Sequence, residues 1–363
     1  MKPDTQILPH RTFGTRVTLF VQGNSLTRGL FGTPVNALLT ATVAWLLVST
    51  LPELMRWTII DAAFLPAEPG TCKAATGACW SFVIAKSRQI LFGIYPFEEQ
   101  WRPMFVCLGV VFLLGYSVRP SSWRPRLLML WLVAIMLIFV LMRGGAFGLP
   151  RVPTSEWGGL PVTLILTVVS IGVAFPCAIL LALGRRSDMP VLSMLTILGV
   201  ELIRGIPLLS LLFVSSIMLP LFLPESLLPD KFVRALVALT LFAAAYLAEV
   251  IRGGLQSLPR GQFEAADALG LSYWQKNRLI VLPQAIRVVI PALANTIIVM
   301  IKNTSLILVV GLFDMISSGR AALADPAWAS PALETYLFIS FIFFALTFSF
   351  ARFADFIERR KSV

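Results

Sequence analysis

The segment Gly253–Arg287 reads GGLQSLPRGQFEAADALGLSYWQKNRLIVLPQAIR and connects two long apolar runs. Its first part predicts a short helix, because alanines favour helix formation and Phe263, Ala266 and Leu269 recur at intervals of three along one face. An apolar face on a polar connection needs a partner to cover it. We therefore expect this segment to be a built docking element and not a slack tether.

The turn in the middle of this segment has its own signals. Gly270 fits a left-handed residue that ends the first helix. Ser272, followed three positions later by Gln275, predicts a capping box that starts a second helix, and Pro283 is expected to end it. The segment is thus predicted to form two short helices joined by a turn.

The composition of the whole chain places this segment in a membrane protein. Of the 363 residues, 57% are apolar and 13% are charged, and the mean hydropathy is +0.82. An ordinary soluble domain is about a quarter charged, so a soluble fold is excluded. The net charge of +11 is spread over short connections and forms no continuous basic stripe, which argues against nucleic acid as a partner.

Eight apolar runs approach the length of about 20 residues that a transmembrane helix needs. They are residues 34–52, 103–118, 127–143, 158–183, 195–223, 232–251, 290–312 and 334–352. The second and third runs are the shortest and depend on flanking arginines that reach the membrane surface. We expect an all-α polytopic membrane protein with about eight transmembrane helices.

The distribution of Lys and Arg predicts the orientation of these helices. Basic residues are concentrated in the N-terminal segment, in every second connection and in the C-terminal tail, whereas acidic residues favour the other connections. The positive-inside rule therefore predicts that both termini are cytoplasmic. The N-terminal segment lacks the apolar region and cleavage site of a signal peptide, so we expect the first span to act as its own anchor.

The runs group into two parts. Residues 1–150 hold three spans and a long outside loop, and residues 155–363 hold five spans and the segment quoted above, which we delimit as the connection 253–289. We find no internal repeat that would indicate an inverted-repeat transporter.

The four cysteines form no paired clusters of the kind that bind metal, and no metal site is predicted. Cys107 and Cys177 lie within apolar runs and are expected to be small core residues. Cys72 and Cys79 share one polar loop and can form a disulfide if that loop faces an oxidising compartment.

The connection 253–289 resembles the cytoplasmic signature of bacterial ABC importer permeases, which is Glu-Ala-Ala, three residues, Gly, nine residues and Ile-x-Leu-Pro. The residues that fill the signature, with every interval kept, are Glu264, Ala265, Ala266, Gly270, Ile280, Leu282 and Pro283. A lone Glu-Ala-Ala would carry no weight, whereas seven specified positions at fixed spacing on an inside connection are highly specific.

The resemblance implies a type I ABC importer permease core of five helices in the bacterial inner membrane. It implies that this connection is a coupling helix that docks on a separate ATP-binding subunit dimer, which binds ATP and Mg; no cofactor is expected in this chain. Glu264 would then make a polar contact at the docking surface. The alternative interpretation is that Glu264 only favours the first helical turn, where negative charge is stabilised.

Three further segments resemble the polar amino-acid permease family. They are AAYLAEVIRGGLQSLPRGQFEAADALGL at residues 244–271, ELIRGIPLL at Glu201–Leu209 and IKNTSL at Ile301–Leu306. The three extra N-terminal spans and the long loop resemble the larger M-type subunit of general L-amino-acid (Aap-type) or glutamate/aspartate systems. This implies a periplasmic amino-acid-binding protein and a second homologous permease subunit, most simply in a heterodimer, as partners.

Lys302 lies near the middle of the seventh run, where a lysine costs about 2.5–3.5 kcal/mol on insertion scales, so it must face protein or water. Asn295, seven residues earlier, shares its helical face. One interpretation is a polar translocation pocket that receives an amino-acid carboxylate; the other is an ion pair with Glu249 or Glu201. The full set of pathway candidates is Lys302, Asn295, Thr304, Ser305, Glu249, Glu201 and Arg204, of which Glu201 and Arg204 can also simply pair with each other.

Other classes of function fit the sequence less well. The chain has no G-x-x-x-x-G-K-[ST] nucleotide loop, and its one histidine lies in the N-terminal arm, so we expect no enzyme and no catalytic residue. An ion-gradient-driven secondary transporter or channel is the serious rival, but it leaves the coupling signature without a purpose.

Overall fold

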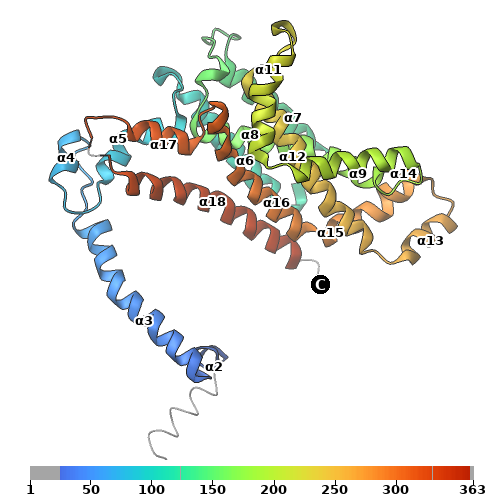
Figure 1. Ribbon diagram of the computed structural model, residues 1–363, viewed down its shortest axis with the longest axis horizontal. Coiled ribbons are helices and arrows are strands. Elements are labelled where there is room, and N and C mark those ends of the chain that lie inside the picture. Colours follow the sequence, from blue (N-terminus) through green and yellow to red (C-terminus); the bar gives the residue numbers. More distant parts are fainter. Residues whose placement is uncertain (1–24, 123, 329, 360–363) are drawn as a thin grey trace, which may run out of the picture. The chain divides into compact units, whose positions relative to one another are not determined.

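The computed structural model describes residues 25–122, 124–328 and 330–359, and the elements within these ranges are helices (Figure 1). The described chain contains one isolated bridge, between Ala63 and Cys79, and no strand. This confirms the predicted all-α fold class. Residues 1–24 and 360–363 belong to the two terminal segments that we predict to be cytoplasmic, and they lie outside the described residues.

The described residues fall into two compact units that meet between Ser81 and Phe82. The helices of the first unit are α2 (Ser25–Phe31), α3 (Pro34–Met55), the π-helical turn η1 (Arg56–Ile60) and α4 (Pro69–Ala74). Thr33 caps α3 by accepting a hydrogen bond from the backbone N–H of Asn36. No residue of α3 is buried, as expected for an apolar helix whose solvent is lipid.

The second unit begins within α5 (Trp80–Phe92) and contains the remaining helices. They are η2 (Phe97–Glu99), α6 (Trp101–Ser117), η3 (Pro120–Ser122), α7 (Pro125–Arg143), η4 (Thr154–Glu156), α8 (Gly159–Gly184), α9 (Pro190–Gly205), α10 (Leu208–Phe213), η5 (Val214–Met218), α11 (Leu219–Phe222), η6 (Glu225–Leu227), α12 (Lys231–Gln256), α13 (Arg260–Ala268), α14 (Tyr273–Lys276), η7 (Asn277–Val281), α15 (Leu282–Val288), α16 (Ile290–Asn303), η8 (Thr304–Val310), α17 (Met315–Leu323) and α18 (Ala332–Arg359).

Helices α8 and α12 form the centre of the second unit and pack along each other (Figure 1). The contact is rich in alanine: Ala174, Ala178 and Ala182 of α8 are fully buried, as are Ala235 and Ala248 of α12. Small side chains let helix backbones approach closely, which is how helices associate when lipid surrounds them. The close packing of these helices therefore depends on residues that have little volume and no charge.

Six described helical segments are long and apolar enough to cross a membrane by length and composition. They are Pro34–Ile60, Pro125–Arg143, Gly159–Gly184, Lys231–Gln256, Ile290–Val310 and Ala332–Arg359. The predicted second span coincides with α6, which has 17 residues and so lies at the lower limit for a spanning helix. A further span arises if the predicted fifth run is counted as one broken helix.

That fifth run, residues 195–223, is not the continuous helix that we expected. The chain bends by 101° between α9 and the helical stretch Leu208–Phe222. The residue before Pro207 is Ile206, whose φ and ψ of −96° and 130° are extended, because the proline ring disfavours helical geometry in the preceding residue. The apolar run thus predicted a helical segment of spanning length but not the direction of its backbone.

The division of the chain at about residue 150 remains a prediction from the distribution of spans. In the structure, α5, α6 and α7 belong to the same compact unit as α8–α18. A close backbone contact at Gly159, where α8 begins, joins the two groups of helices: a Cβ on Gly159 would lie 2.1 Å from the carbonyl oxygen of Leu91, at the end of α5.

Candidate functional site

The connection 253–289, which we call the coupling loop because of the signature that it carries, has its two short helices at one end of the second unit (Figure 1). Helix α13 ends at Ala268, and Gly270 follows it with a φ of +70°, the left-handed conformation expected from the sequence. Ser272 and Gln275 form the predicted capping box at the start of α14. An ion pair of 2.6 Å between Lys276 Nζ and Asp267 Oδ1 connects the two helices. The loop is therefore a rigid hairpin of helices.

The signature residues divide between a buried side and an open side of this hairpin. Ala266 is fully buried, whereas Glu264 and Ala265 are exposed. Phe263 is half-buried against the core, but Leu269 is 74% exposed. The predicted common face of Phe263, Ala266 and Leu269 is therefore wrong, because the helix ends at Ala268 and the left-handed turn directs Leu269 outward.

The open side of the hairpin carries two aromatic residues that sequence reasoning missed. Tyr273 is 47% exposed and Trp274 is 63% exposed, and their rings pack edge to face with centroids 5.6 Å apart. The sequence signal that could have identified them is a pair of adjacent aromatic residues in an otherwise polar inside connection. We define the docking face of the loop as Glu264, Ala265, Leu269, Tyr273 and Trp274.

Pro283 does not end the second helix, contrary to our expectation. The chain passes from α14 through the π-helical turn η7 into α15, in which Pro283 occupies the first turn. The N–H groups of a first turn lack intrahelical partners, so a proline is tolerated there. Ile280 and Leu282 are half-buried, and Leu282 packs against the core.

The loop is fastened to the transmembrane helices by Arg186, which follows α8. Its guanidinium lies 5.1 Å from the centre of the Phe263 ring and donates a 2.8 Å hydrogen bond to the carbonyl of Leu255. The return helix also packs tightly on α12: a Cβ on Gly254 would lie 2.7 Å from the carbonyl of Ala285. A displacement of α13 would therefore be passed to both α8 and α12.

A cavity of about 280 Å³ lies between α12 and α16. Its walls are Phe242, Tyr246, Asn295, Thr296, Val299 and Met300. The ring centroids of Phe242 and Tyr246 lie 4.5 Å apart. The hydroxyl of Thr296 donates to the carbonyl of Ala292 at 2.9 Å, whereas the Asn295 amide and the Tyr246 hydroxyl have no hydrogen-bond partner among the described residues. Two polar groups thus remain available in an otherwise apolar cavity.

Of the seven predicted pathway residues, Asn295 is the one that lines this cavity. Phe242 and Tyr246 were missed, although their positions four residues apart, with Glu249 three residues further, place all three on one helical face. Thr304 is buried and donates to the carbonyl of Ile301, and Ser305 donates to the carbonyl of Lys302. These two hydroxyls are therefore occupied by their own helix.

Lys302 lies beyond the cavity on α16, and its side chain is exposed. No acidic side chain of the described chain lies within 4.0 Å of its ammonium group. The alternative of an ion pair with Glu249 or Glu201 is thus wrong, because arginines occupy both carboxylates.

Those arginines form a network with the two glutamates across three helices. Glu249 Oε2 accepts a 3.0 Å hydrogen bond from Arg185, at the end of α8, and another of 3.0 Å from Arg252 on α12. Arg185 also donates to Glu201 on α9 at 2.9 Å, and Arg204 lies 3.4 Å from Glu201 and 3.7 Å from Glu249. The network connects the C-terminal end of α9 to α8 and α12. The chain bends directly after this end.

The network also adjoins the cavity, since the Arg204 guanidinium lies 5.7 Å from the centre of the Tyr246 ring. A change in the position of α9 would therefore reach one wall of the cavity. Arg204 thus connects the ion-pair network to the cavity wall, and both carboxylates of the network are paired with arginines.

We expect Glu249→Gln to destabilise the protein, because Arg252 loses its counter-charge and Arg185 keeps only its pair with Glu201. The glutamate side chain is 24% exposed, so solvent screens part of the loss and we expect about 1–2 kcal/mol. The apparent unfolding temperature in detergent measures it. Asp355→Asn is the matched control, since its pair with Arg352 spans 3.8 Å and both side chains are more than half exposed. Equal shifts for both variants would contradict a structural network.

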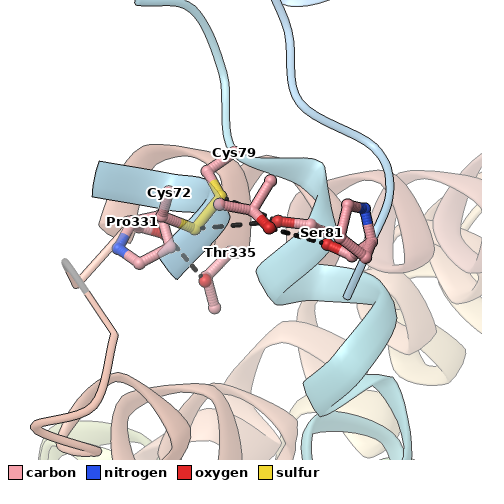
Figure 2. The surroundings of a disulfide bond; sticks show 7 residues. Cys72, Cys79, Ser81, Pro331 and Thr335 are labelled. Atoms are coloured by element: carbon pink, nitrogen blue, oxygen red, sulfur yellow. Dashed lines mark hydrogen bonds between the residues drawn. A yellow bond between two sulfur atoms is a disulfide. The ribbon is translucent and has the colours of Figure 1, made fainter. Parts of the chain in front are cut away.

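In the first unit, Cys72 and Cys79 are joined by a disulfide, with Cα atoms 5.3 Å apart (Figure 2). The Ser81 hydroxyl lies 3.0 Å from the sulfur of Cys79 and is buried with it. Disulfides persist in oxidising compartments, which agrees with the outside position that the charge pattern predicts for this loop. Of the other cysteines, Cys107 is buried, but Cys177 is exposed on α8 and is not the core residue that we expected.

Comparisons with known proteins agree with these features. Residues 174–363 match the family described as "Binding-protein-dependent transport system inner membrane component". The chain is 43% identical to the inner membrane amino-acid ABC transporter permease protein YhdY of Escherichia coli K12, over 92% of this chain and 91% of YhdY. It is 35% identical to the glutamate/glutamine/aspartate/asparagine transport system permease protein BztC of Rhodobacter capsulatus, over 91% of this chain and 92% of BztC. A solved structure of "an amino acid ABC transporter with histidines" shares 31% identity over 55% of this chain and 90% of its own, with a TM-score of 0.48.

Proposed function

The chain belongs to the family of binding-protein-dependent transport system inner membrane components, and from this premise we propose that it is the permease subunit of an ATP-driven importer of polar L-amino acids. The names of YhdY and BztC support an amino acid as the substrate, and BztC's name includes acidic amino acids and their amides. The observation that carries the proposal is the cavity between α12 and α16, because its chemistry suits a small zwitterion.

The cavity offers a separate contact for each charge of an amino acid. The Asn295 amide can donate hydrogen bonds to a carboxylate, and hydrogen bonds to charged groups are worth about 1.5–3 kcal/mol. The faces of Phe242 and Tyr246 can attract an ammonium group. Both contacts are to the backbone part of an amino acid, so the selection of side chains falls to the binding protein that delivers it.

Coupling to ATP is proposed to pass through the docking face of the loop. Its exposed glutamate and its exposed aromatic residues form the mixed polar and aromatic surface that is typical of a protein interface. Arg186 and the Gly254 contact connect this surface to α8 and α12, so closure of an ATPase dimer with its bound ATP and Mg would move the helices that line the cavity. The chain is then a transport subunit, and hydrolysis occurs in its partner.

Lys302 supports a second permease subunit as a partner. An exposed ammonium in a span cannot remain in lipid at the cost cited above, so the surface beside it must be covered by protein or water. A translocation pathway shared between two homologous chains supplies both the covering protein and the water. We therefore propose a heterodimer in the inner membrane with both termini in the cytoplasm and the binding protein on the opposite side.

We expect Asn295→Leu to raise the KM for amino-acid uptake by about tenfold, because one hydrogen bond to a charged group is lost. Uptake by proteoliposomes that hold the complete importer and its binding protein measures this. Thr296→Val is the matched control: it also removes a polar group from the cavity, but that hydroxyl already donates to its own helix. We expect it to leave the KM near the wild-type value.

Two outcomes would contradict the proposal. If Asn295→Leu and Thr296→Val behave alike, the cavity does not bind the substrate. If uptake continues in proteoliposomes without an ATPase subunit and follows an ion gradient, the chain is a secondary transporter.

A further inference from the structure

A second region of cavities differs from the substrate cavity in the polarity of its walls. Two neighbouring cavities of about 240 and 380 Å³ share Leu114 of α6 and Phe350 of α18. Together they form what we call the apolar groove. Its further walls are Val111, Gly115, Ser117, Val118, Leu346, Ser349 and Phe353 on one side, and Leu128, Trp131, Leu132, Ile135, Thr167, Val168, Val169, Ile171, Gly172, Val173 and Ile297 on the other.

The groove offers no free hydrogen-bond donor to an occupant. Ser117, Thr167 and Ser349 are its hydroxyl residues, and each donates to a carbonyl of its own helix at 2.6–2.8 Å. The indole N–H of Trp131 is also used, since it donates to the Ser117 oxygen at 3.0 Å. An amino acid would lose its hydration here without compensation. The occupant must be a hydrocarbon.

The length of the groove fits one leaflet of a bilayer. Its walls extend from Val111 to Val118 on α6 and from Leu346 to Phe353 on α18, which is about 10 Å along each helix at 1.5 Å per residue. Half of a hydrocarbon core about 30 Å thick is about 15 Å. The groove is therefore suited to the chain of a lipid that enters from one membrane surface.

Basic residues stand at one end of the groove. Val118 and Leu128 are lining residues at the two ends of the α6–α7 connection, and that connection carries Arg119, Arg124 and Arg126. All three arginines are exposed, and none forms an ion pair within the described part of the chain. Three uncompensated guanidinium groups beside a hydrocarbon-lined opening are complementary to a lipid phosphate.

We propose that the apolar groove binds an acyl chain of an anionic phospholipid whose headgroup is held by Arg119, Arg124 and Arg126. The lipid fills the space between α6 and α7 on one side and α8, α16 and α18 on the other. Ile297 of α16 lines the groove, whereas Thr296, the preceding residue, lines the substrate cavity. The lipid therefore supports the helix that carries Asn295, and transport is expected to depend on it.

Glycine substitutions can fill the groove without disturbing the helices. A Cβ at Gly115 or Gly172 would meet no atom within 4 Å, and leucine favours helix more than glycine does. The full-length protein in mild detergent is incubated with phosphatidylglycerol or phosphatidylcholine of the same acyl chains, and bound lipid is counted by native mass spectrometry. We expect Gly115→Leu and Gly172→Leu to lose the bound phosphatidylglycerol. Gly109→Leu is the matched control, because it lies on α6 outside the groove and also has open space.

A second variant tests the headgroup contact. Replacing Arg119, Arg124 and Arg126 together by glutamine is expected to lower the affinity for phosphatidylglycerol on the order of fivefold per arginine and to abolish the preference over phosphatidylcholine. Equal retention of both lipids by the wild type, or unchanged retention in Gly115→Leu, would overturn the proposal. So would a change in oligomeric state on filling the groove, which would mean that a protein occupies it. Lipid counting requires no transport, so its result is independent of the proposed function.

Discussion

Glu264→Lys is expected to lower binding-protein-stimulated ATP hydrolysis and amino-acid uptake together, by about a hundredfold. Glu264 is exposed on the docking face and has no partner among the described residues. A like-charge contact across an interface costs several kcal/mol, and a hundredfold loss corresponds to about 2.8 kcal/mol. Because the side chain is exposed and forms no ion pair with the described residues, the fold itself is expected to be unaffected.

The measurement uses proteoliposomes that contain the complete importer, with hydrolysis and uptake followed in the same preparation. Glu358→Lys is the matched control, since it makes the same change of charge at an exposed position near the end of α18, outside the docking face. Co-purification of the ATPase subunit, followed separately, shows whether docking or only its transmission is lost.

Loss of uptake with hydrolysis still stimulated would contradict the proposed role, because Glu264 would then act on the substrate side and not on the coupling side. Wild-type values for both activities would show that Glu264 only stabilises its own helix. The exposed position of the side chain makes this second result the less expected one.

The local chemistry of the coupling loop was predictable from the sequence. The left-handed Gly270 and the capping box at Ser272 and Gln275 depend on residues within a few positions of each other, and both form as expected. Prolines were harder to interpret. Pro283 lies in a first turn that tolerates it, whereas Pro207 breaks an apolar run, and which of these happens depends on what packs beside each turn.

The candidate site could not be predicted in full, because it depends on distances in space that the spacing of residues along the sequence does not give. The sequence showed that Glu201 and Arg204 can pair, and that a lysine in a span needs an explanation. It did not show that Arg185, from another connection, would reach both glutamates and leave Lys302 without a counter-charge. Nor did it show that the Tyr246 ring would face Asn295 across a cavity, because residues 49 positions apart along the chain meet only through the packing of α12 on α16.

Gly159→Ala is expected to destabilise the protein by about 3 kcal/mol or more. Gly159 begins α8 with a φ of +71°, and a Cβ there would lie 2.1 Å from the carbonyl oxygen of Leu91 at the end of α5. Both the left-handed backbone and the backbone overlap oppose any side chain, and strain of this kind costs 1–3 kcal/mol before the overlap is counted. The apparent unfolding temperature in detergent and the yield of monodisperse protein measure the loss.

Gly172→Ala is the matched control, because it makes the same substitution in the same helix at a position with no atom within 4 Å of the added Cβ. It is expected to be neutral or stabilising, since alanine favours helix by up to about 1 kcal/mol over glycine. If Gly159→Ala instead unfolds at the wild-type temperature, α5 does not approach α8 closely, and residues before 150 form an extension that the permease core can lose. If it unfolds well below the control, the helices that precede residue 150 are part of the framework on which the core is built, and a chain that begins at residue 155 is not expected to fold alone.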